Sequence, residues 1–318
     1  MRRALVVGID DYAFGPLAGC VADANNLAQL LERHHDGSKN FDVRRLTDPP
    51  DEVTRPALRE AVIDLFRQPA EVALLYFSGH GSESDLGGHL VTTDARAYDE
   101  GVPMADVINL ANRSVVSESI IVVDSCHSGH LGNVPVGPRD ANVRAEIAEG
   151  VSILTASRST EPALEIEGRG LFTSLLCSAL DGGAADVLGQ TKVAGIYSYI
   201  DESLGPWQQR PLLKAHVSSL LSLRTCAPAI ELTKLRRIVA LFPEQDSLLQ
   251  LDPTYERSDE SANGANVETF DVLVSFRNAR LVEVVTHEHL YYAAIESGTV
   301  QLTPLGRHYW RLVKAERL

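Results

Sequence analysis

A histidine and a cysteine each follow closely on a short apolar run, and both residue types take part in nucleophilic catalysis. His80 comes shortly after residues 72–75, and Cys126 comes shortly after residues 120–123. Both runs are typical of buried parallel strands, whose carboxyl ends lie at the same edge of a sheet, where ligands bind. A thiolate becomes an effective nucleophile when a nearby base or cation lowers the pKa of the thiol. The pair therefore predicts a cysteine-peptidase dyad.

The elements that must position this pair alternate between strand and helix patterns over the first 222 residues. Continuous apolar runs indicate strands buried on both faces, and apolar residues at helical spacing indicate amphipathic helices. Strands are expected at residues 5–9, 72–75, 120–123 and 152–155, and helices at residues 23–33, 54–66, 104–111 and 172–180. This alternation predicts an α/β fold with a mostly parallel sheet and helices on both faces.

Six short motifs resemble those of the caspase and metacaspase clan, in the same order along residues 4–222. They lie at residues 5–12, 17–24, 76–81, 124–129, 150–157 and 170–173. The sequence Asp-Ser-Cys-His-Ser-Gly around Cys126 is similar to the metacaspase and bacterial caspase-like (orthocaspase) form and differs from that of animal caspases. The interval from His80 to Cys126 is also close to the about 50 residues seen in caspases. The resemblance implies a caspase-like sandwich, a cysteine endopeptidase and a role as a regulated effector in bacterial stress or defence.

The resemblance assigns the catalytic roles residue by residue. Cys126 is the nucleophile, and His80 forms an ion pair with it and then protonates the leaving amine. The backbone N–H groups of Gly81 and Cys126 form the oxyanion hole, since the clan works as a dyad with two such donors. Three neighbouring histidines stay as weaker alternatives for the base: His89, His127 and His130.

Substrate preference follows from three polar residues that match the metacaspase pattern. Asp23, Ser78 and Asp124 stand where metacaspases line the pocket for the residue before the cleaved bond. Two carboxylates suit a bidentate guanidinium, so the expected substrate is a protein or peptide with Arg, and secondarily Lys, at that position. The alternative interpretation is that Asp23 caps the following helix and Asp124 bonds to a neighbouring loop.

The segment after the nucleophile is a loop rich in Gly, Pro and Asn at residues 129–145. Long loops inside compact domains are usually functional or disordered. Arg139 and Arg144 lie in it and carry the side chain that the expected pocket selects, so they are candidate self-cleavage sites. An ordinary surface loop remains an equal alternative.

No metal or other cofactor is expected. Asp94, Asp99 and Glu100 offer three carboxylates where many metacaspases bind calcium, but calcium takes six to eight oxygens and this loose spacing does not specify a site. The cysteines other than Cys126 sit among apolar or small residues and are interpreted as packing residues. They are Cys20, Cys177 and Cys226.

The amino-acid composition excludes some classes of binding partner and indicates the cellular compartment. The formal net charge of −14 leaves no polybasic footprint for nucleic acid or an anionic membrane. No run approaches the about 18 apolar residues of a membrane span. Four irregularly spaced cysteines favour a reducing compartment, so a cytoplasmic protein is expected.

Two domains are expected: a caspase-like domain at residues 1–224 and an accessory domain at residues 225–318. A helix at 267–278, a strand at 281–284, two β-like runs flanking Ser297 and a closing helix starting at Thr303 resemble a winged helix over 267–318. Basic and acidic side chains balance there, so docking of a regulatory protein or autoinhibition is favoured over DNA binding. The alternative function is a DNA- or partner-binding regulator with weak or no peptidase activity.

Overall fold

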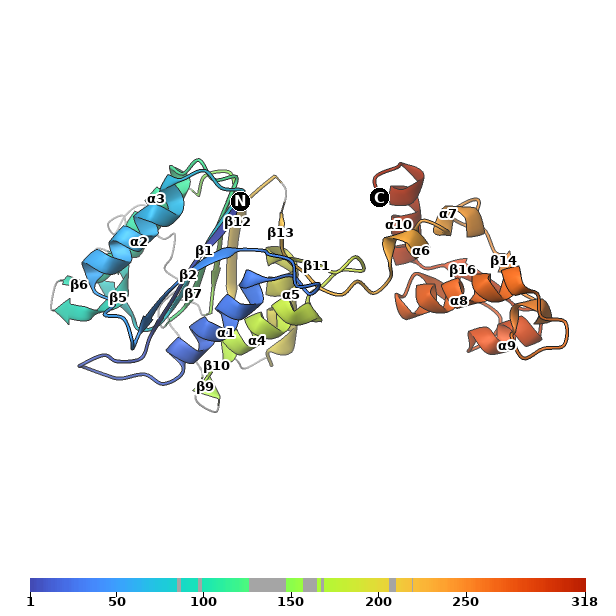
Figure 1. Cartoon of the computed structure of the whole chain (residues 1–318), viewed down its shortest axis with the longest axis horizontal. Coiled ribbons are helices and arrows are strands. Elements are labelled where there is room, and N and C mark those ends of the chain that lie inside the picture. The colour runs from blue at the N-terminus through green and yellow to red at the C-terminus, as the bar shows by residue number, and fades with distance from the viewer. Residues whose placement is uncertain are drawn as a thin grey trace, which may run out of the picture. The chain divides into compact units, whose positions relative to one another are not determined.

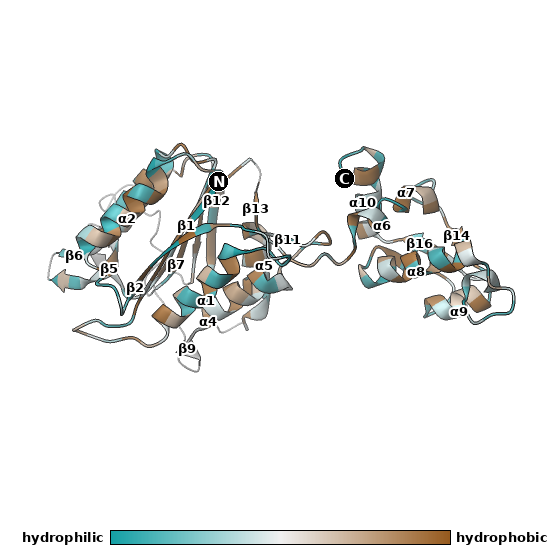
Figure 2. Ribbon diagram, in the orientation of Figure 1, coloured by the Kyte–Doolittle hydropathy of each residue, from teal (hydrophilic) through white to brown (hydrophobic). Residues whose placement is uncertain are grey.

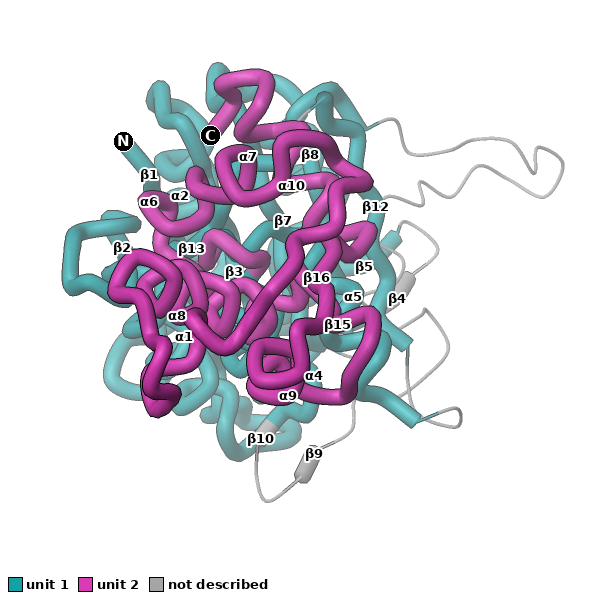
Figure 3. The backbone as a smooth tube through the Cα atoms, turned by 90° about the vertical axis from the view of Figure 1, so that its right-hand side faces the viewer, with its two compact units in different colours: residues 1–185, 190–227 teal, residues 186–189, 228–318 magenta. Residues whose placement is uncertain are grey.

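The computed structural model describes most of the chain, in two compact units. Its residues are 1–84, 87–96, 99–125, 147–156, 165–166, 169–205, 210–218 and 220–318. The first unit comprises residues 1–185 and 190–227, and the second comprises residues 186–189 and 228–318 (Figure 3). The boundary thus lies after residue 227 where residue 224 was expected, and a short segment of the N-terminal part belongs to the second unit.

The first unit is built on a six-stranded sheet with the strand order β12-β8-β7-β3-β1-β2 (Figure 1). Five strands run parallel, and β12 pairs antiparallel with β8 at one edge. The bounds are β1 Arg2–Ile9, β2 Asp42–Asp48, β3 Val72–Ser78, β7 Glu118–Asp124, β8 Val151–Thr155 and β12 Leu212–His216. The four expected strands are all present. The edge strands β2 and β12 escaped prediction because polar residues interrupt their apolar pattern.

Helices cover both faces of this sheet, which confirms the predicted α/β class. On one face lie α1 (Cys20–Glu32), α4 (Leu171–Ser178) and α5 (Val193–Ser203), and on the other lie α2 (Arg55–Arg67) and α3 (Met104–Asn112) (Figure 1). Side chains alternate along each strand, so Ile120 and Val122 enter one core while Ile121 and Val123 enter the other. Both colours of the hydropathy scale alternate along α1 and α2, as expected for amphipathic helices (Figure 2).

Helix ends follow local capping chemistry. α2 begins after Thr54, whose hydroxyl accepts a hydrogen bond from the Ala57 N–H, with Pro56 in the first turn. The expected helix 172–180 ends earlier, because α4 passes after Ser178 into a π-helical turn, Ala179–Gly183. Gly182 takes a positive φ of 124° there, a conformation that favours glycine.

Smaller sheets flank the central one. A three-stranded antiparallel sheet follows β3 directly and consists of β4 Gly81–Ser84, β5 Gly87–Arg96 and β6 Asp99–Pro103. Two strand pairs are β9 Glu165–Ile166 with β10 Arg169–Gly170, and β11 Gln190–Lys192 with β13 Ser222–Thr225. Two of these strands lie next to candidate site residues. β4 begins at Gly81, directly after His80, and β10 ends at Gly170, the first residue of the motif 170–173.

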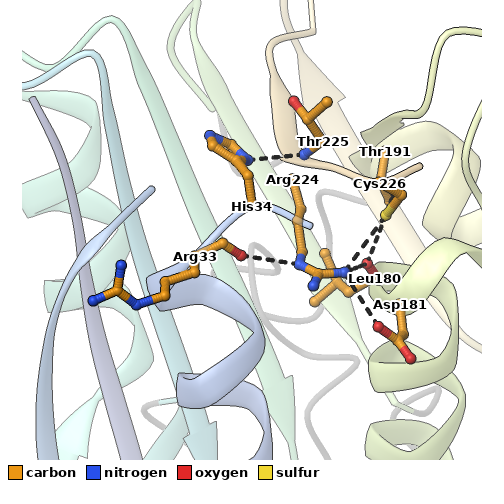
Figure 4. A network of polar contacts seen from close by, with 8 residues as sticks. All are labelled: Arg33, His34, Leu180, Asp181, Thr191, Arg224, Thr225 and Cys226. Carbon is orange, nitrogen blue, oxygen red and sulfur yellow. Dashed lines mark hydrogen bonds and ion pairs between the residues drawn. The ribbon is translucent and has the colours of Figure 1, made fainter. Parts of the chain in front are cut away.

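Arg224 of β13 ties two helix ends together (Figure 4). Its guanidinium donates hydrogen bonds to the carbonyl oxygens of Arg33 after α1 and of Leu180 in the π-helical turn, at 3.1 and 2.9 Å, and it pairs with Asp181. Carbonyl groups at helix ends lack partners within the helix, so this one side chain satisfies two of them. The Cys226 thiol donates to the same Leu180 carbonyl and is buried, which confirms its expected packing role.

The second unit has its own hydrophobic core, to which Phe276 and Trp310 contribute. Its sheet has the order β14-β16-β15, all antiparallel. The elements are α6 Leu232–Leu235, α7 Ile238–Leu241, β14 Leu249–Gln250, a 3-10 turn Pro253–Tyr255, α8 Gly264–Asn278, β15 Val282–Val284, α9 Leu290–Ile295, β16 Thr299–Leu302 and α10 Pro304–Lys314.

One expectation for this unit was wrong. The run before Ser297 was expected to be β-like, but it forms helix α9, because Leu290, Ala293 and Ala294 are buried at helical spacing. β16 pairs with β15, so the two runs flanking Ser297 do not pair with each other. The winged-helix interpretation stays a prediction. None of the helices in the described ranges is long and apolar enough to cross a membrane.

Candidate active site

Strand order brings the two predicted motifs together at one edge of the sheet. β3 and β7 are neighbours, and their last residues, Ser78 and Asp124, pair in register. His80 follows two residues after Ser78. Cys126 follows two residues after Asp124 but lies outside the described residues, as do His127 and His130. Parallel pairing therefore places the ends of the two strands side by side, and the meeting of His80 and Cys126 beyond them stays a prediction.

The segment 12–15, distant in sequence, holds the half-buried His80 ring. The Nε2 atom lies 2.7 Å from the carbonyl oxygen of Gly15, which can only accept, so Nε2 carries the proton and donates it to this carbonyl. The ring also contacts the aromatic rings of Tyr12 and Phe14, with centroids 4.6 and 5.7 Å away. In this tautomer Nδ1 is the nitrogen that can take up a proton, as a general base must.

Tyr12 also fixes the backbone of the turn. Its hydroxyl accepts a hydrogen bond from the His80 N–H and donates one to the Val91 carbonyl, both at 3.1 Å. Burial raises the pKa of Tyr12 far above its usual value, so the hydroxyl stays neutral and can donate. A Cβ on Gly79 would lie 2.5 Å from this hydroxyl, so the glycine is needed for the close approach.

The predicted oxyanion donor Gly81 is the first residue of β4, where it pairs with Leu90 of β5. The His80 carbonyl accepts from the Val91 N–H, which anchors the turn on the same strand. The alternative base His89 lies in β5 opposite Ser82, with its Nδ1 buried and without a hydrogen-bond partner among the described residues. Strand pairing therefore holds the Gly81 backbone immediately beside His80.

The two predicted pocket carboxylates, Asp23 and Asp124, are buried and approach each other at Gly170. The Gly170 N–H donates to Asp23 Oδ2 at 3.0 Å, and the Thr173 hydroxyl donates to Asp124 Oδ2 at 2.7 Å. A Cβ placed on Gly170 would lie 3.2 Å from Asp23 Oδ2 and 2.6 Å from Asp124 Oδ2. The two acidic side chains, which are 101 positions apart in sequence, therefore form one pair.

The capping alternative for Asp23 does not hold, because another carboxylate caps α1. The Asp10 side chain accepts from the N–H groups of Cys20 and Val21, at 2.8 and 3.3 Å. Asp23 lies inside the first turn of the helix, and its carboxylate accepts from Gly170. The structure thus separates a capping aspartate, which sequence reasoning missed, from a buried aspartate that faces another element.

Cys20 belongs to the same cluster, although it was interpreted as a packing residue. Burial raises the pKa of its thiol to about 12, with further increases from the charges of Asp10, Asp124 and Asp23, while a hydrogen bond with Ser78 opposes the shift. Cys20 precedes Asp23 by three residues and so shares its helix face, a spacing that could have linked the two from sequence. The thiol is thus a neutral neighbour of both carboxylates and of Ser78.

Two of the three candidate calcium ligands, Asp94 and Asp99, have structural partners. The Asp94 carboxylate accepts from the Arg55 N–H and the Thr92 hydroxyl, and Asp99 pairs with the Arg55 guanidinium. Within the described ranges, no group of three or more His, Cys, Asp or Glu side chains is arranged to hold a metal ion. The candidate cleavage residues Arg139 and Arg144 lie outside those ranges.

Comparison with known proteins identifies the family and a similar fold. The family model described as caspase domain matches residues 1–219. Metacaspase-1 of Pyricularia oryzae is 26% identical over 157 residues, which cover 42% of this chain and 38% of that protein, so the chain spans well under half of this relative. A crystal structure of a Geobacter sulfurreducens protein has a TM-score of 0.50 at 16% identity, covers 68% of this chain and 94% of that one, and shows the fold alone.

Proposed function

The chain belongs to the caspase-domain family of cysteine peptidases, and from this premise we propose a metacaspase-type endopeptidase that cleaves after Arg, and secondarily after Lys. One observation carries the proposal. Asp23 in the first turn of α1 and Asp124 at the end of β7 are both buried and approach the same residue, Gly170. Two buried carboxylates that lie close together suit a basic side chain before the cleaved bond.

The geometry of His80 supports a mechanism. The Gly15 carbonyl holds the proton on Nε2, so Nδ1 is the atom that takes the proton of the Cys126 thiol. The resulting thiolate attacks the carbonyl carbon of the substrate and forms the C–S bond. The backbone N–H groups of Gly81 and Cys126 stabilise the oxyanion that develops.

The second half of the reaction uses the same imidazole. His80, now protonated, gives its Nδ1 proton to the departing amine as the C–N bond breaks. Water then attacks the thioester, His80 takes up a proton from that water, and the thiol of Cys126 is regenerated with release of the acid product. This mechanism requires two ionisable side chains and no metal.

The proposed preference for basic residues also makes this chain a candidate substrate of its own activity. Arg139 and Arg144 follow Cys126 closely in sequence and carry the side chain that the acidic pair selects. We propose them as self-cleavage sites. The second unit is proposed to dock a regulatory protein or to restrain the peptidase, since the basic and acidic side chains of residues 267–318 balance and leave no excess positive charge for nucleic acid.

Hydrolysis of fluorogenic peptides ending in Arg, Lys, citrulline or Asp, with and without calcium, tests the proposal. We expect cleavage after Arg and Lys, much less after citrulline, which is nearly isosteric with Arg but uncharged, and none with the Cys126→Ala variant. Cleavage after Asp or citrulline at the Arg rate would contradict the role of the acidic pair. Hydrolysis that persists in Cys126→Ala would contradict the dyad.

A further inference from the structure

The start of helix α4 contacts both members of the acidic pair, and the mechanism above gives this segment no role. We call residues 170–173 the α4 turn. The Gly170 N–H reaches Asp23 and the Thr173 hydroxyl reaches Asp124, so two donors three residues apart hold two carboxylates from separate elements. The positive end of the α4 dipole lies at the same place and favours negative charge there.

The direction of each hydrogen bond in this arrangement is determined. Thr173 donates to Asp124 Oδ2 at 2.7 Å, and the Tyr76 hydroxyl lies 2.6 Å from the Thr173 oxygen. Because the single Thr173 proton points to the carboxylate, Tyr76 donates to Thr173. Thr173 and Tyr76 are fully buried, and burial raises the pKa of Tyr76 well above its usual value, so Tyr76 remains a donor. A chain of buried donors therefore orients the Asp124 carboxylate.

Gly170 contributes space and needs no unusual backbone conformation. Its φ of −64° and ψ of 121° are open to any residue. A Cβ there would nevertheless lie 2.6 Å from Asp124 Oδ2, closer than real Cβ contacts allow. The glycine therefore allows both carboxylates to approach the same backbone position.

We infer that the α4 turn sets the spacing and orientation of Asp23 and Asp124 and thereby makes the pocket prefer Arg over Lys. This inference rests on the proposed function. A guanidinium is a planar fork that bonds best to acceptors in fixed positions, whereas an ammonium is a compact point charge that tolerates misplaced carboxylates. Thr173, Tyr76 and Gly170 are positioning residues in this scheme, and Asp23 and Asp124 are the groups that touch substrate.

The test compares Thr173→Val, which is nearly isosteric but lacks the hydroxyl, with Thr173→Ser, which keeps it. For Thr173→Val we expect kcat/KM for an Arg peptide to fall by about 10- to 100-fold, as for the loss of a hydrogen bond to a charged group, mainly through KM. Cleavage after Lys should fall several-fold less, so the Arg-to-Lys ratio drops. Thr173→Ser should restore the ratio, and Tyr76→Phe should lower it in the same direction.

A matched control and a separate readout keep the outcomes apart. Thr191→Val removes another fully buried threonine hydroxyl, in β11, and should leave both peptides unaffected. Thermal unfolding shows which variants are folded. If Thr173→Val is not folded, the test compares Tyr76→Phe with Thr173→Ser instead. An unchanged Arg-to-Lys ratio in a folded Thr173→Val or Tyr76→Phe variant overturns the inference alone. A wild-type chain that cleaves after neither Arg nor Lys overturns the proposed function and the inference with it.

Discussion

At the scale of single residues, the environment of Cys20 predicts a thiol that is much less reactive than the proposed nucleophile Cys126. Cys20 is partly accessible, yet burial and the charges of Asp10, Asp124 and Asp23 raise the pKa of its thiol to about 12. A thiol protonated at neutral pH reacts slowly, whereas a nucleophile paired with an imidazole is a thiolate. Accessibility alone would therefore mislead about which cysteine performs chemistry.

Selective alkylation tests this contrast. At pH 7.5 with limiting iodoacetamide, we expect carboxamidomethylation of Cys126 first, with loss of peptide hydrolysis in proportion. Peptide mass mapping locates the label. The Cys126→Ala variant should stay nearly unlabelled over the same time. Equal labelling of Cys20 and Cys126 in the wild-type chain would show that Cys20 is not protected by its surroundings.

At the scale of elements, the start of α1 links helix stability to the acidic pair. The Asp10 carboxylate caps the helix at Cys20 and Val21, and one turn later the same helix presents Asp23 to the α4 turn. Cap residues typically contribute about 1 kcal/mol to stability. The cap therefore also fixes the position from which Asp23 enters the site.

Replacing Asp10 by Ala should lower the free energy of unfolding by about 1 kcal/mol, because two N–H groups of the first turn lose their acceptor. Urea denaturation followed by circular dichroism measures it. The same variant should raise KM for an Arg peptide more than it lowers kcat. Asp10→Asn, which keeps an acceptor oxygen, is the control and should retain most of both. Full stability in Asp10→Ala would contradict the capping role.

The end of α1 carries a pH-dependent contact. His34 Nδ1 accepts a hydrogen bond from the Thr225 N–H at 3.0 Å, which requires that nitrogen to be unprotonated (Figure 4). Burial, followed by the nearby Arg2 charge, lowers the pKa of His34 below its usual value, with Arg224 adding to the shift, while Asp36 opposes it. The neutral imidazole is therefore the form that stabilises the fold.

This shift predicts the sign of a pH effect. Below the unfolded-state pKa of about 6.5, the unfolded chain binds a proton that the folded chain resists, so stability falls as the pH drops from 7.5 toward 5.5. Urea midpoints measured across this range should show a shallower slope for His34→Asn than for the wild type. His35→Asn, next to it and exposed, is the control. Equal slopes for wild type and His34→Asn would contradict the prediction.

At the scale of the whole molecule, each unit has its own hydrophobic core. Among the described residues, core side chains of the first unit pack on both faces of the sheet, and the core of the second unit also takes up Val187 and Leu188 from the segment 186–189. A truncation after residue 227 would therefore expose these two apolar side chains. A shortened protein used to study autoinhibition needs polar replacements at both positions.

Core substitutions should separate the two units in calorimetry. Leu273→Ala removes a fully buried side chain from the second core and should cost that unit about 2–5 kcal/mol of unfolding free energy. We expect the unfolding transition of the second unit to move to a lower temperature. The transition of the first unit, which is tracked by loss of peptide hydrolysis, should stay at its temperature. Leu31→Ala, equally buried in the first unit, should move the other transition. Joint movement of both transitions would show that the units unfold together.

The sequence alone determined the local elements and the residues that follow them. Strands β3 and β7 are continuous apolar runs, so their ends, and with them the position of His80, were readable from periodicity. The resemblance to the family motifs added Asp23, Ser78 and Asp124. Edge strand β12 and helix α9 were missed or misassigned, because their patterns mix polar and apolar residues in ways that only packing resolves.

Tertiary structure decided which of these residues meet. Gly15 holds His80 across 65 positions, Gly170 holds Asp23 across 147, and Thr173 holds Asp124 across 49. Hydrophobic periodicity reports burial within one element, whereas such contacts depend on strand order, register and helix placement. Sequence therefore predicted which side chains carry the chemistry, and the packing of α1 and α4 on one face of the sheet determined how the two carboxylates are held together.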